Sequence, residues 1–376
     1  MRLDPTVLTP RERALREEVR AFLDERLPRG SFEVGLGMPG AVDAEFSREL
    51  GARGWLGMAL PTEYGGGGRS AVDRLIVAEE LLARGAPVGF HWVADRQSGT
   101  NILANGTEQQ KCDLLPGIAR GEISFAIGMS EPDAGSDLAA VRTRAVPVAG
   151  GWRVSGRKIW TTGAATATHL IALFRTSDER HGGLTQFIVE RNTPGLSVSP
   201  IPFIDGTHDF CELTFEDVFI PDEMRLGDVG AGWGQNTGEL ALERGGVDRW
   251  MSMVSTLELW ARRPEVIQDP AALEDLGTIV ARLWALRAMS LSVARMVDQG
   301  RSPVVEAALI KEMATRFEQD TVELLARYFP GSPRLDSDDA YESQLARALL
   351  VSPSWSIRGG TSEILRTIIA KGLARQ

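Results

Sequence analysis

Two short segments near the middle of the chain hold the residue types best suited to gripping a ligand. Residues 129–137 form a polar loop with two serines and a glycine, and residues 158–163 place Trp160 next to Thr161 and Thr162. An aromatic ring flanked by hydroxyls can pack on a flat ring system and hydrogen-bond to its edge, while a serine- and glycine-containing loop suits a phosphate-bearing tail. Either segment alone is equally compatible with a polar turn beside a core tryptophan.

Together, in this order and spacing, the two segments resemble the flavin site of the acyl-CoA dehydrogenase family. The resemblance covers nearly the whole chain, including residues 106–111 (Gly-Thr-Glu-Gln-Gln-Lys) and 360–364 (Gly-Thr-Ser-Glu-Ile). It implies FAD as the cofactor, with Trp160 beside the isoalloxazine, the Thr162 hydroxyl near flavin N5, and Ser130 at the pyrimidine side. The cofactor-binding residues that it implies are Ile127, Met129, Ser130, Trp160, Thr161, Thr162, Thr361 and Glu363.

The resemblance also implies the chemistry. Members of the family remove a proton from the α-carbon of an acyl thioester while hydride leaves the β-carbon for the flavin, so a carboxylate base is required. Most members carry it in a Tyr-Glu-Gly-Thr segment, but this chain has Arg-Gly-Gly-Thr at residues 358–361. A minority place the glutamate immediately before an arginine on an earlier helix, which Glu243 and Arg244 match. We therefore expect Glu243 to be the base. The acyl-CoA contacts are expected at Ser136, Arg244 and Gly359, with the Gly359 N–H donating to the thioester oxygen.

Other interpretations of these residues are open. Most neighbouring glutamate and arginine residues on helices form exposed ion pairs, and Glu239, one turn earlier, is a rival base. Gly245 and Gly246 follow the arginine directly. Together with Gly359, they are expected either to leave room for a bulky or branched acyl group or to allow close packing between helices.

Composition and charge narrow the class of protein. The chain has 376 residues, 43% of them hydrophobic, which is enough for a substantial core in two or three regions. A net charge of -10 disfavours binding to nucleic acid or anionic membranes. The two cysteines are too few for a disulfide framework or a zinc site. No signal peptide or transmembrane span is expected, so the sequence predicts a cytoplasmic protein without a bound metal.

The hydrophobic periodicity predicts an α+β fold in which helices predominate, in agreement with the family's plan. The expected domains are an N-terminal helical domain at 1–120, a β domain at 121–228 and a C-terminal helical bundle at 229–376. Alternating segments without intervening helices favour an antiparallel sheet or barrel over a parallel sheet. The expected strands lie near residues 123–127, 169–174, 184–189 and 210–218.

Local signals predict several helix boundaries. Thr9 is expected to cap a helix that contains Leu15, Val19 and Phe22, and Asp269 to cap another that begins at Pro270. Further helices are expected at 43–53, 71–84 and 108–120, and two C-terminal stripes are expected to face the core: Leu276, Ile279, Leu283, Leu286 and Met289, and Leu309, Met313 and Phe317. The Gly-x-Gly-x-x-Gly pattern at 35–40 is not expected to bind a dinucleotide, because no buried strand precedes it.

Two features of the family are missing. Its Arg-x-x-Phe-Gly segment, which reaches a neighbouring subunit's flavin, has no counterpart at 260–266, and its Phe-Gly-Gly turn is replaced by Phe-Pro-Gly-Ser-Pro at 329–333. Every site of a symmetric homo-oligomer would lack these contacts. The chain thus resembles the two-gene dehydrogenases of actinobacterial sterol side-chain and related acyl-CoA degradation. These assemble as α2β2 tetramers with a sister subunit; a homo-oligomer is the alternative. An electron-transfer flavoprotein is the expected electron acceptor.

The leading hypothesis is a FAD-dependent dehydrogenase that converts an acyl-CoA to a trans-2-enoyl-CoA. One alternative is a non-catalytic partner subunit that completes another chain's site. Another is a flavin oxidase or monooxygenase of the same fold, acting on a carrier-bound or nitrogenous substrate. Turnover of a Glu243→Ala variant distinguishes the first two hypotheses, and release of hydrogen peroxide identifies the third. The sequence specifies neither the acyl group nor whether coenzyme A or an acyl carrier protein bears it.

Overall fold

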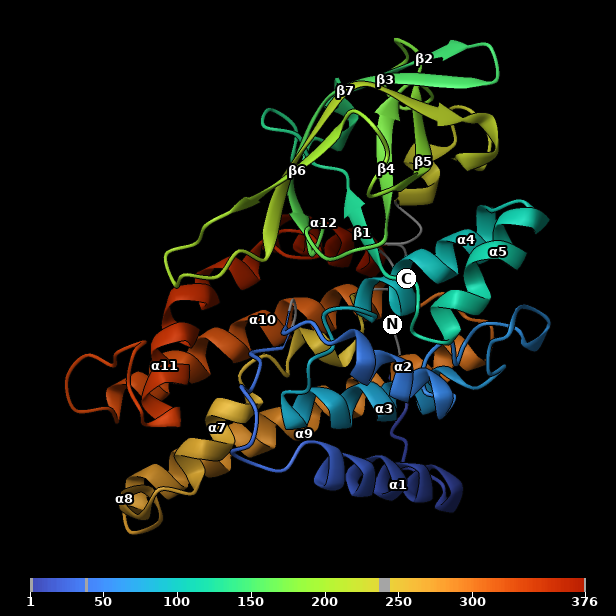
Figure 1. Ribbon diagram of the computed structural model, residues 1–376. Helices are drawn as coiled ribbons and strands as arrows, with labels where there is room; N and C mark the ends of the chain where they lie inside the picture. The colour runs from blue at the N-terminus through green and yellow to red at the C-terminus, as the bar shows by residue number, and fades with distance from the viewer. Residues whose placement is uncertain (1–2, 38–39, 237–243, 375–376) are drawn as a thin grey trace. The chain divides into compact units, whose positions relative to one another are not determined.

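The structure is a computed structural model that describes residues 3–37, 40–236 and 244–374, and these residues form two compact units (Figure 1). Unit 1 consists of Met1–Gly40, Ser70–Pro87 and Leu240–Gln376, and unit 2 consists of Ala41–Arg69 and Val88–Glu239. Each unit is therefore assembled from segments that lie far apart in the sequence.

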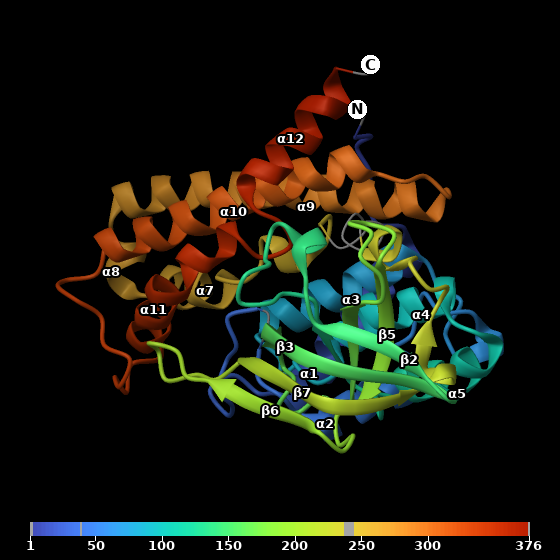
Figure 2. The ribbon, with the colours of Figure 1, turned by 90° about the horizontal axis from the view of Figure 1, so that it is seen from above.

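Unit 1 is built from helices in its described residues. They are α1 (Pro10–Arg26), α3 (Ala71–Arg84), α7 (Val254–Ala261), α8 (Pro264–Ile267), α9 (Pro270–Asp298), α10 (Val304–Arg327), α11 (Ala340–Val351) and α12 (Ser362–Leu373). Helix α9 lies beside α10, which also packs against α11 and α12 (Figure 2). Helix α3 packs against both α1 and α9. The two longest helices, α9 and α10, thus form the centre of the bundle.

The predicted caps of α1 and α9 are confirmed. The Thr9 side chain accepts a hydrogen bond from the backbone N–H of Glu12, and the Glu12 carboxylate accepts one from the N–H of Thr9, which completes a capping box. Asp269 accepts a hydrogen bond from the N–H of Ala271, and Pro270 is the first residue of α9. The N-terminus of each helix can be predicted from local sequence, because the backbone N–H that the capping side chain satisfies lies within three residues of it.

One of the two predicted C-terminal stripes is partly wrong. In α9, Ile279 and Leu286 are buried as expected, but in α10 Met313 is exposed. The buried face of α10 instead runs through Ile310, Ala314 and Phe317. Alanine contributes little to a hydrophobic pattern, so the predicted stripe followed the larger side chains and was displaced around the helix from the face that is buried.

Helix α9 has an unusual composition for a surface helix. It is the one helix in the described part of the chain that is long and apolar enough to cross a membrane, with a mean hydropathy of 1.3 in its most apolar window, of which 33% is buried. The expectation that no segment approaches a transmembrane span is therefore wrong on length and composition. One such helix is weak evidence for a membrane, because one side of α9 packs on α3 and α10. Its other side carries exposed apolar side chains, Leu273, Val280 and Trp284.

Unit 2 combines short helices with a sheet. Its α-helices include α2 (Ala44–Ala52), α4 (Gly99–Asn105) and α5 (Glu108–Ala119), and its strands among the described residues are β1 (Phe125–Gly128), β2 (Arg144–Val148), β3 (Gly151–Thr162), β4 (His169–Arg175), β5 (Leu184–Glu190), β6 (Leu196–Ile201), β7 (Phe210–Pro221) and β8 (Arg225–Leu226). The four predicted strands correspond to β1, β4, β5 and β7.

The sheet is mixed rather than purely antiparallel. Its order is β6-β7-β3-β2-β4-β5-β8, and β1 pairs with β4 off this path. Most neighbours are antiparallel, as predicted, but β1 runs parallel to β4 over four residue pairs, and β2 meets β4 in a single parallel bridge. Strand β4 can run parallel to β1 because the chain reverses twice between them, once in the β2–β3 hairpin and once between β3 and β4.

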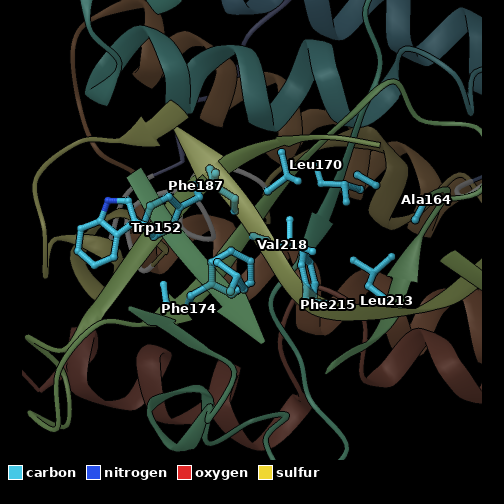
Figure 3. Packing of buried hydrophobic residues seen from close by; sticks show 14 of the residues in the cluster. Trp152, Ala164, Leu170, Phe174, Phe187, Leu213, Phe215 and Val218 are labelled. Carbon is cyan, nitrogen blue, oxygen red and sulfur yellow. The ribbon is translucent and has the colours of Figure 1, made fainter. Parts of the chain in front are cut away.

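Aromatic side chains form much of the hydrophobic core against which the strands pack (Figure 3). The rings of Trp152 and Phe187 pack edge-to-face with their centroids 5.5 Å apart, and those of Phe174 and Phe215 do so at 5.1 Å. A second cluster joins α5 to β1 and β4 through residues such as Leu115, Phe125 and Ile171. Strand β1, which precedes the polar segment at 129–137, thereby contributes to both clusters through Ala126 and Phe125, and β3 contributes to the first through Trp152 and Val154.

Candidate functional site

Trp160 owes its position to a β-bulge near the end of β3. Lys158 pairs with Leu213 and Thr161 with Cys211, so β3 has one more residue in this interval than β7. Trp160 has a φ of +61°, which a bulky residue rarely adopts, and its side chain is 53% exposed. Its ring contacts Phe210 edge-on at 6.3 Å. A large ring held open to solvent in a strained backbone is typical of a binding surface.

The two threonines that follow Trp160 differ in environment. Thr161 is fully buried, and its hydroxyl has no hydrogen-bond partner among the described residues. Thr162 is half-buried at the last position of β3. A buried hydroxyl without a partner is costly, so the Thr161 hydroxyl is a polar atom that a bound polar group would satisfy.

The loop at 129–137 is attached to β3 next to the tryptophan. The backbone N–H of Ile159 donates to the carbonyl of Ser130 at 2.9 Å, and Glu131 and Ala134 exchange two backbone hydrogen bonds across a tight turn. Met129 and Ser130 are half-buried, whereas Ser136 is exposed. The structure therefore bonds the main chain of Ser130 to the residue before Trp160 and leaves Ser136 exposed at the outer end of the loop.

Sequence reasoning missed one pair of residues in this loop. Lys158 is completely buried, and its Nζ lies 2.8 Å from Oε1 of Glu131, which is also buried. A lysine beside an aromatic motif is ordinarily exposed. The alternation along β3 could have indicated that Lys158 points inward, because Trp152 and Val154 lie at the same parity of the strand and are buried.

A second set of predicted residues meets in unit 1. The Nε of Arg244 donates to the carbonyl of Gly359 at 3.1 Å, and Arg244 is buried. The next residue along the turn, Gly360, has a φ of +103° and also lies close to the Arg244 guanidinium. The predicted base Glu243 and its rival Glu239 lie outside the described residues. Arg244 itself is in a turn that leads to a short 3-10 helix at Val247–Arg249, so the helix expected at this point does not include it.

The same turn is held by a buried ion pair. Nη2 of Arg358 lies 2.5 Å from Oε2 of Glu318 and 2.8 Å from the Ser252 hydroxyl. Oε1 of Glu318 accepts the backbone N–H of Ser252 at 2.7 Å. Burial raises the pKa of Glu318, although the charge of Arg358 and the hydrogen bonds from Ser252 oppose this rise. Residue 358 thus serves as an anchor of the turn.

The hypothesis that Gly245 and Gly359 leave room for a bulky acyl group is wrong. A Cβ added at Gly245 would lie 2.8 Å from Cγ1 of Val293 and 3.4 Å from the Cβ of Ala307, so α9 and α10 fill that space. At Gly359 the space is filled by the guanidinium of Arg249. The alternative of close packing holds at Gly245, although the residue lies in a turn rather than inside a helix.

The last two predicted cofactor residues begin α12. The Thr361 side chain caps the helix by accepting a hydrogen bond from the N–H of Ile364, and Glu363 is exposed in the first turn. Both therefore have a local structural role, in which an acidic side chain near a helix N-terminus is favourable. Contact with a cofactor stays a prediction.

Comparison with known proteins agrees with this arrangement of segments. The family models for the N-terminal, middle and C-terminal domains of acyl-CoA dehydrogenase match residues 9–122, 126–218 and 230–374. The chain belongs to the acyl-CoA dehydrogenase family. It is 32% identical to the acyl-CoA dehydrogenase IpdE1 of Mycobacterium tuberculosis, over 96% of this chain and 97% of that protein.

Two solved structures have a similar fold. The Tcur3481-Tcur3483 steroid ACAD matches with a TM-score of 0.86 and 31% identity, over 100% of this chain and 99% of the other. The ChsE4-ChsE5 complex from Mycobacterium tuberculosis matches with a TM-score of 0.82 and 29% identity, over 98% and 97% of the two chains. The predicted fold class, a helical fold with a central sheet domain, is thereby confirmed.

This acyl-CoA dehydrogenase is an oxidoreductase that acts on acyl-CoA, and its cofactor is FAD. Unit 2 fits such a cofactor, because it presents an open aromatic ring at Trp160 and an unsatisfied buried hydroxyl at Thr161. Among the described residues, no group of three or more histidine, cysteine or acidic side chains could hold a metal ion.

Proposed function

We propose that the protein oxidises the Cα–Cβ bond of an acyl-CoA to a trans-2-enoyl-CoA, with Glu243 as the general base. The observation that carries this proposal is the hydrogen bond from Arg244 to Gly359. Residue 359, where most of the family would have its base, carries no carboxylate, and Glu243 immediately precedes the arginine that is bonded to this position. Glu243 is thus the acidic residue next in sequence to the side chain that is bonded to this position.

Each residue then has a defined task. The Glu243 carboxylate takes the α-proton, and the Gly359 N–H donates to the thioester oxygen, where charge develops as that proton leaves. Arg244 holds the Gly359 carbonyl and thereby orients the same peptide segment. Bound FAD supplies the acceptor for the hydride from the β-carbon. We place Ser136 at the acyl-CoA.

Within unit 2, the proposed FAD contacts come from the chain around β1 and β3. Ile127, Met129 and Ser130 would meet the pyrimidine side through main-chain and hydroxyl groups, and Trp160 would pack beside the ring system. The remaining contacts are assigned to Thr161, Thr162, Thr361 and Glu363. The half-buried Ser130 and Thr162 and the exposed ring of Trp160 support this assignment in unit 2.

Glu243→Gln tests the base, and Glu239→Gln is the matched control because Glu239 is the rival. In enzyme with normal FAD content, we expect Glu243→Gln to lower kcat by about 10²–10⁴-fold, the usual contribution of a positioned base. Glu239→Gln should change kcat little. Full turnover of Glu243→Gln would favour a partner subunit without a catalytic role. Hydrogen peroxide release without any added acceptor would favour a flavin oxidase or monooxygenase.

We further propose that the enzyme works with a sister subunit of the same family and passes its electrons to an electron-transfer flavoprotein. Neither Arg-x-x-Phe-Gly nor Phe-Gly-Gly occurs at the positions where a neighbour's flavin would need them. The similar structures include the Tcur3481-Tcur3483 steroid ACAD and the ChsE4-ChsE5 complex, each of which is named for two proteins. The exposed apolar face of α9 provides a surface for such a subunit. Members of this family are soluble enzymes, and we place this one in the cytoplasm.

A further inference from the structure

The buried ion pair between Lys158 and Glu131 joins the two segments of the proposed flavin site. Nζ of Lys158 donates to Oε1 of Glu131 at 2.8 Å and to the carbonyl of Met129 at 3.1 Å. One residue further along β3, the N–H of Ile159 donates to the Ser130 carbonyl at 2.9 Å. Three consecutive loop residues are thus bonded to two consecutive strand residues, immediately before Trp160.

The surroundings of Lys158 leave the ammonium no contact with water. It is 0% exposed, and Nζ also lies 5.7 Å from the ring centroid of Phe174, on the inner side of the sheet. Its stem passes Gly128, where an added Cβ would lie 3.8 Å from Cγ of Lys158 and 3.1 Å from Leu213. Burial lowers the pKa of Lys158 to about 8, because desolvation outweighs the attraction of Glu131.

Glu131 extends the connection to a third segment. Its carboxylate accepts the backbone N–H of Arg142 at 2.6 Å and that of Thr143 at 2.9 Å. The Thr143 hydroxyl then donates to the carbonyl of Arg157, next to Lys158, at 3.0 Å. The Glu131 carboxylate thereby bonds the start of the loop at 129–137 to the chain before β2. Both segments are also hydrogen-bonded to β3 at Arg157 and Lys158.

An ion pair of this kind is a poor way to stabilise a fold. Desolvation of two charges offsets most of their attraction, and apolar side chains of similar size often stabilise an interior as well or better. The pair instead contributes directional hydrogen bonds. Together with the N–H of Ile159, they fix the positions of the Met129 and Ser130 carbonyls relative to the β-bulge of β3. The strained φ of Trp160 has to be held by such bonds if the ring is to keep one orientation.

We propose that Lys158 and Glu131 are positioning residues for FAD, which hold the loop at Ser130 and the ring of Trp160 in the arrangement that the cofactor requires. This inference rests on the proposed flavin site. Neither side chain touches the cofactor in this assignment. They act through the Met129 carbonyl, the Ser130 main chain and the bulge of β3.

The test uses the assembled enzyme, purified with whatever subunit accompanies it, stripped of FAD and then titrated with FAD. Lys158→Met removes the ammonium and keeps the length of the stem, and Glu131→Gln keeps the shape of the carboxylate. We expect each variant to lower FAD affinity by at least about tenfold and to alter the visible circular dichroism of the bound flavin. The double variant should lose less than the sum of the two single variants, because the two side chains share one contact.

Lys111→Met is the matched control. Lys111 also lies 2.8 Å from a glutamate, Glu108, and 6.0 Å from an aromatic ring, that of Tyr64, but this pair is on the surface of α5. Its loss should leave FAD affinity and the flavin spectrum unchanged. If Lys158→Met does not fold, Glu131→Gln decides the question by the same two measurements.

Two results would overturn different statements. If the Lys158 and Glu131 variants melt at lower temperature but bind FAD with the wild-type affinity and spectrum, the pair is only structural and the inference fails. If Trp160→Ala and Thr162→Ala also leave FAD binding unchanged, the proposed flavin site itself is wrong. A loss in the Trp160 and Thr162 variants without a loss in the Lys158 and Glu131 variants rejects the positioning role alone.

Discussion

The guanidinium of Arg249 lies against Gly359: a Cβ added at Gly359 would sit 3.0 Å from Nη1 and 3.1 Å from Cζ of that arginine. Gly359 has a φ of +67°, in the left-handed region where side chains are disfavoured. The place where the resemblance puts the base of most family members is thus filled by a cation from another segment. This turn is built around three arginines: Arg244 donates to the Gly359 carbonyl, and Arg358 donates to the carboxylate of Glu318 and the hydroxyl of Ser252.

A carboxylate introduced by Gly359→Glu should therefore fail to replace Glu243. The new side chain would meet Arg249, which would hold it ionised and lower its basicity, and the positive φ would cost on the order of 1 kcal/mol. We expect the double variant Glu243→Gln/Gly359→Glu to be as slow as Glu243→Gln alone, measured by reduction of an artificial electron acceptor. Gly359→Ala controls for the backbone strain. Recovery of turnover in the double variant, but not in Glu243→Gln/Gly359→Ala, would contradict this account.

The buried pair of Glu318 and Arg358 should matter far more for stability than a similar pair on the surface. Glu318→Gln leaves the mostly buried Arg358 without its counter-charge, and we expect the free energy of unfolding to fall by about 3 kcal/mol. Asp320 lies on α10 like Glu318, and Asp320→Asn breaks its exposed pair with Arg282 of α9, which should cost about 1 kcal/mol or less. Urea unfolding measures both. Equal losses in the two variants would show that the burial of Glu318 has no energetic consequence.

Local signals in the sequence predicted much of the fold, because the groups involved are near neighbours. The cap at Thr9 depends on a residue three positions away, and the boundary at Asp269 depends on the proline that follows. Strands β4 and β5 were evident from their apolar runs, and β7 was evident from its alternating pattern. Which face of a helix is buried was harder to predict where the buried face contains small residues. In α10, Ala314 is buried and the larger Met313 is exposed.

The parts of the site that escaped prediction depend on contacts between distant residues. Lys158 finds Glu131 across 27 residues, and Arg358 finds Glu318 across 40. A charged side chain is expected at the surface unless its partner is known, and no local pattern identifies that partner. For the same reason, the space beside Gly359 could not be assigned to Arg249 from the sequence. The prediction for Glu243 is untested, because it lies outside the described residues.

The stability of unit 2 should fall as the pH is lowered below about 6.5. His91 is buried against the Ser47 hydroxyl, with its Nδ1 at 2.9 Å, and burial lowers its pKa to about 3. Between these two pH values the unfolded chain takes up a proton that the folded protein does not. The free energy of unfolding therefore decreases with falling pH across that window.

Comparison of urea unfolding at pH 7 and pH 4.5 measures this effect. From pH 6.5 to 4.5 the contribution of His91 should be about 2–3 kcal/mol. His91→Asn retains a polar partner for Ser47 but cannot be protonated, so its loss of stability over the same interval should be smaller by that amount. His208→Gln, at an exposed histidine, should behave like the wild type. A His91→Asn variant with the wild-type pH dependence would refute the argument.

Trp284 offers the most direct test of a partner on α9. Its side chain is 73% exposed, and Leu273 and Val280 lie eleven and four residues before it, so that all three share one face of the helix. An exposed apolar face of this kind is typical of a subunit interface, and truncation of a central aromatic anchor there usually costs about 2 kcal/mol or more. We expect Trp284→Ser to raise the dissociation constant of the assembly by about 30-fold, measured by sedimentation equilibrium. Ile267→Ser, at an exposed apolar side chain of α8, is the control that should leave the assembly intact. If the two variants assemble equally well, the apolar face of α9 is not the surface on which the sister subunit binds.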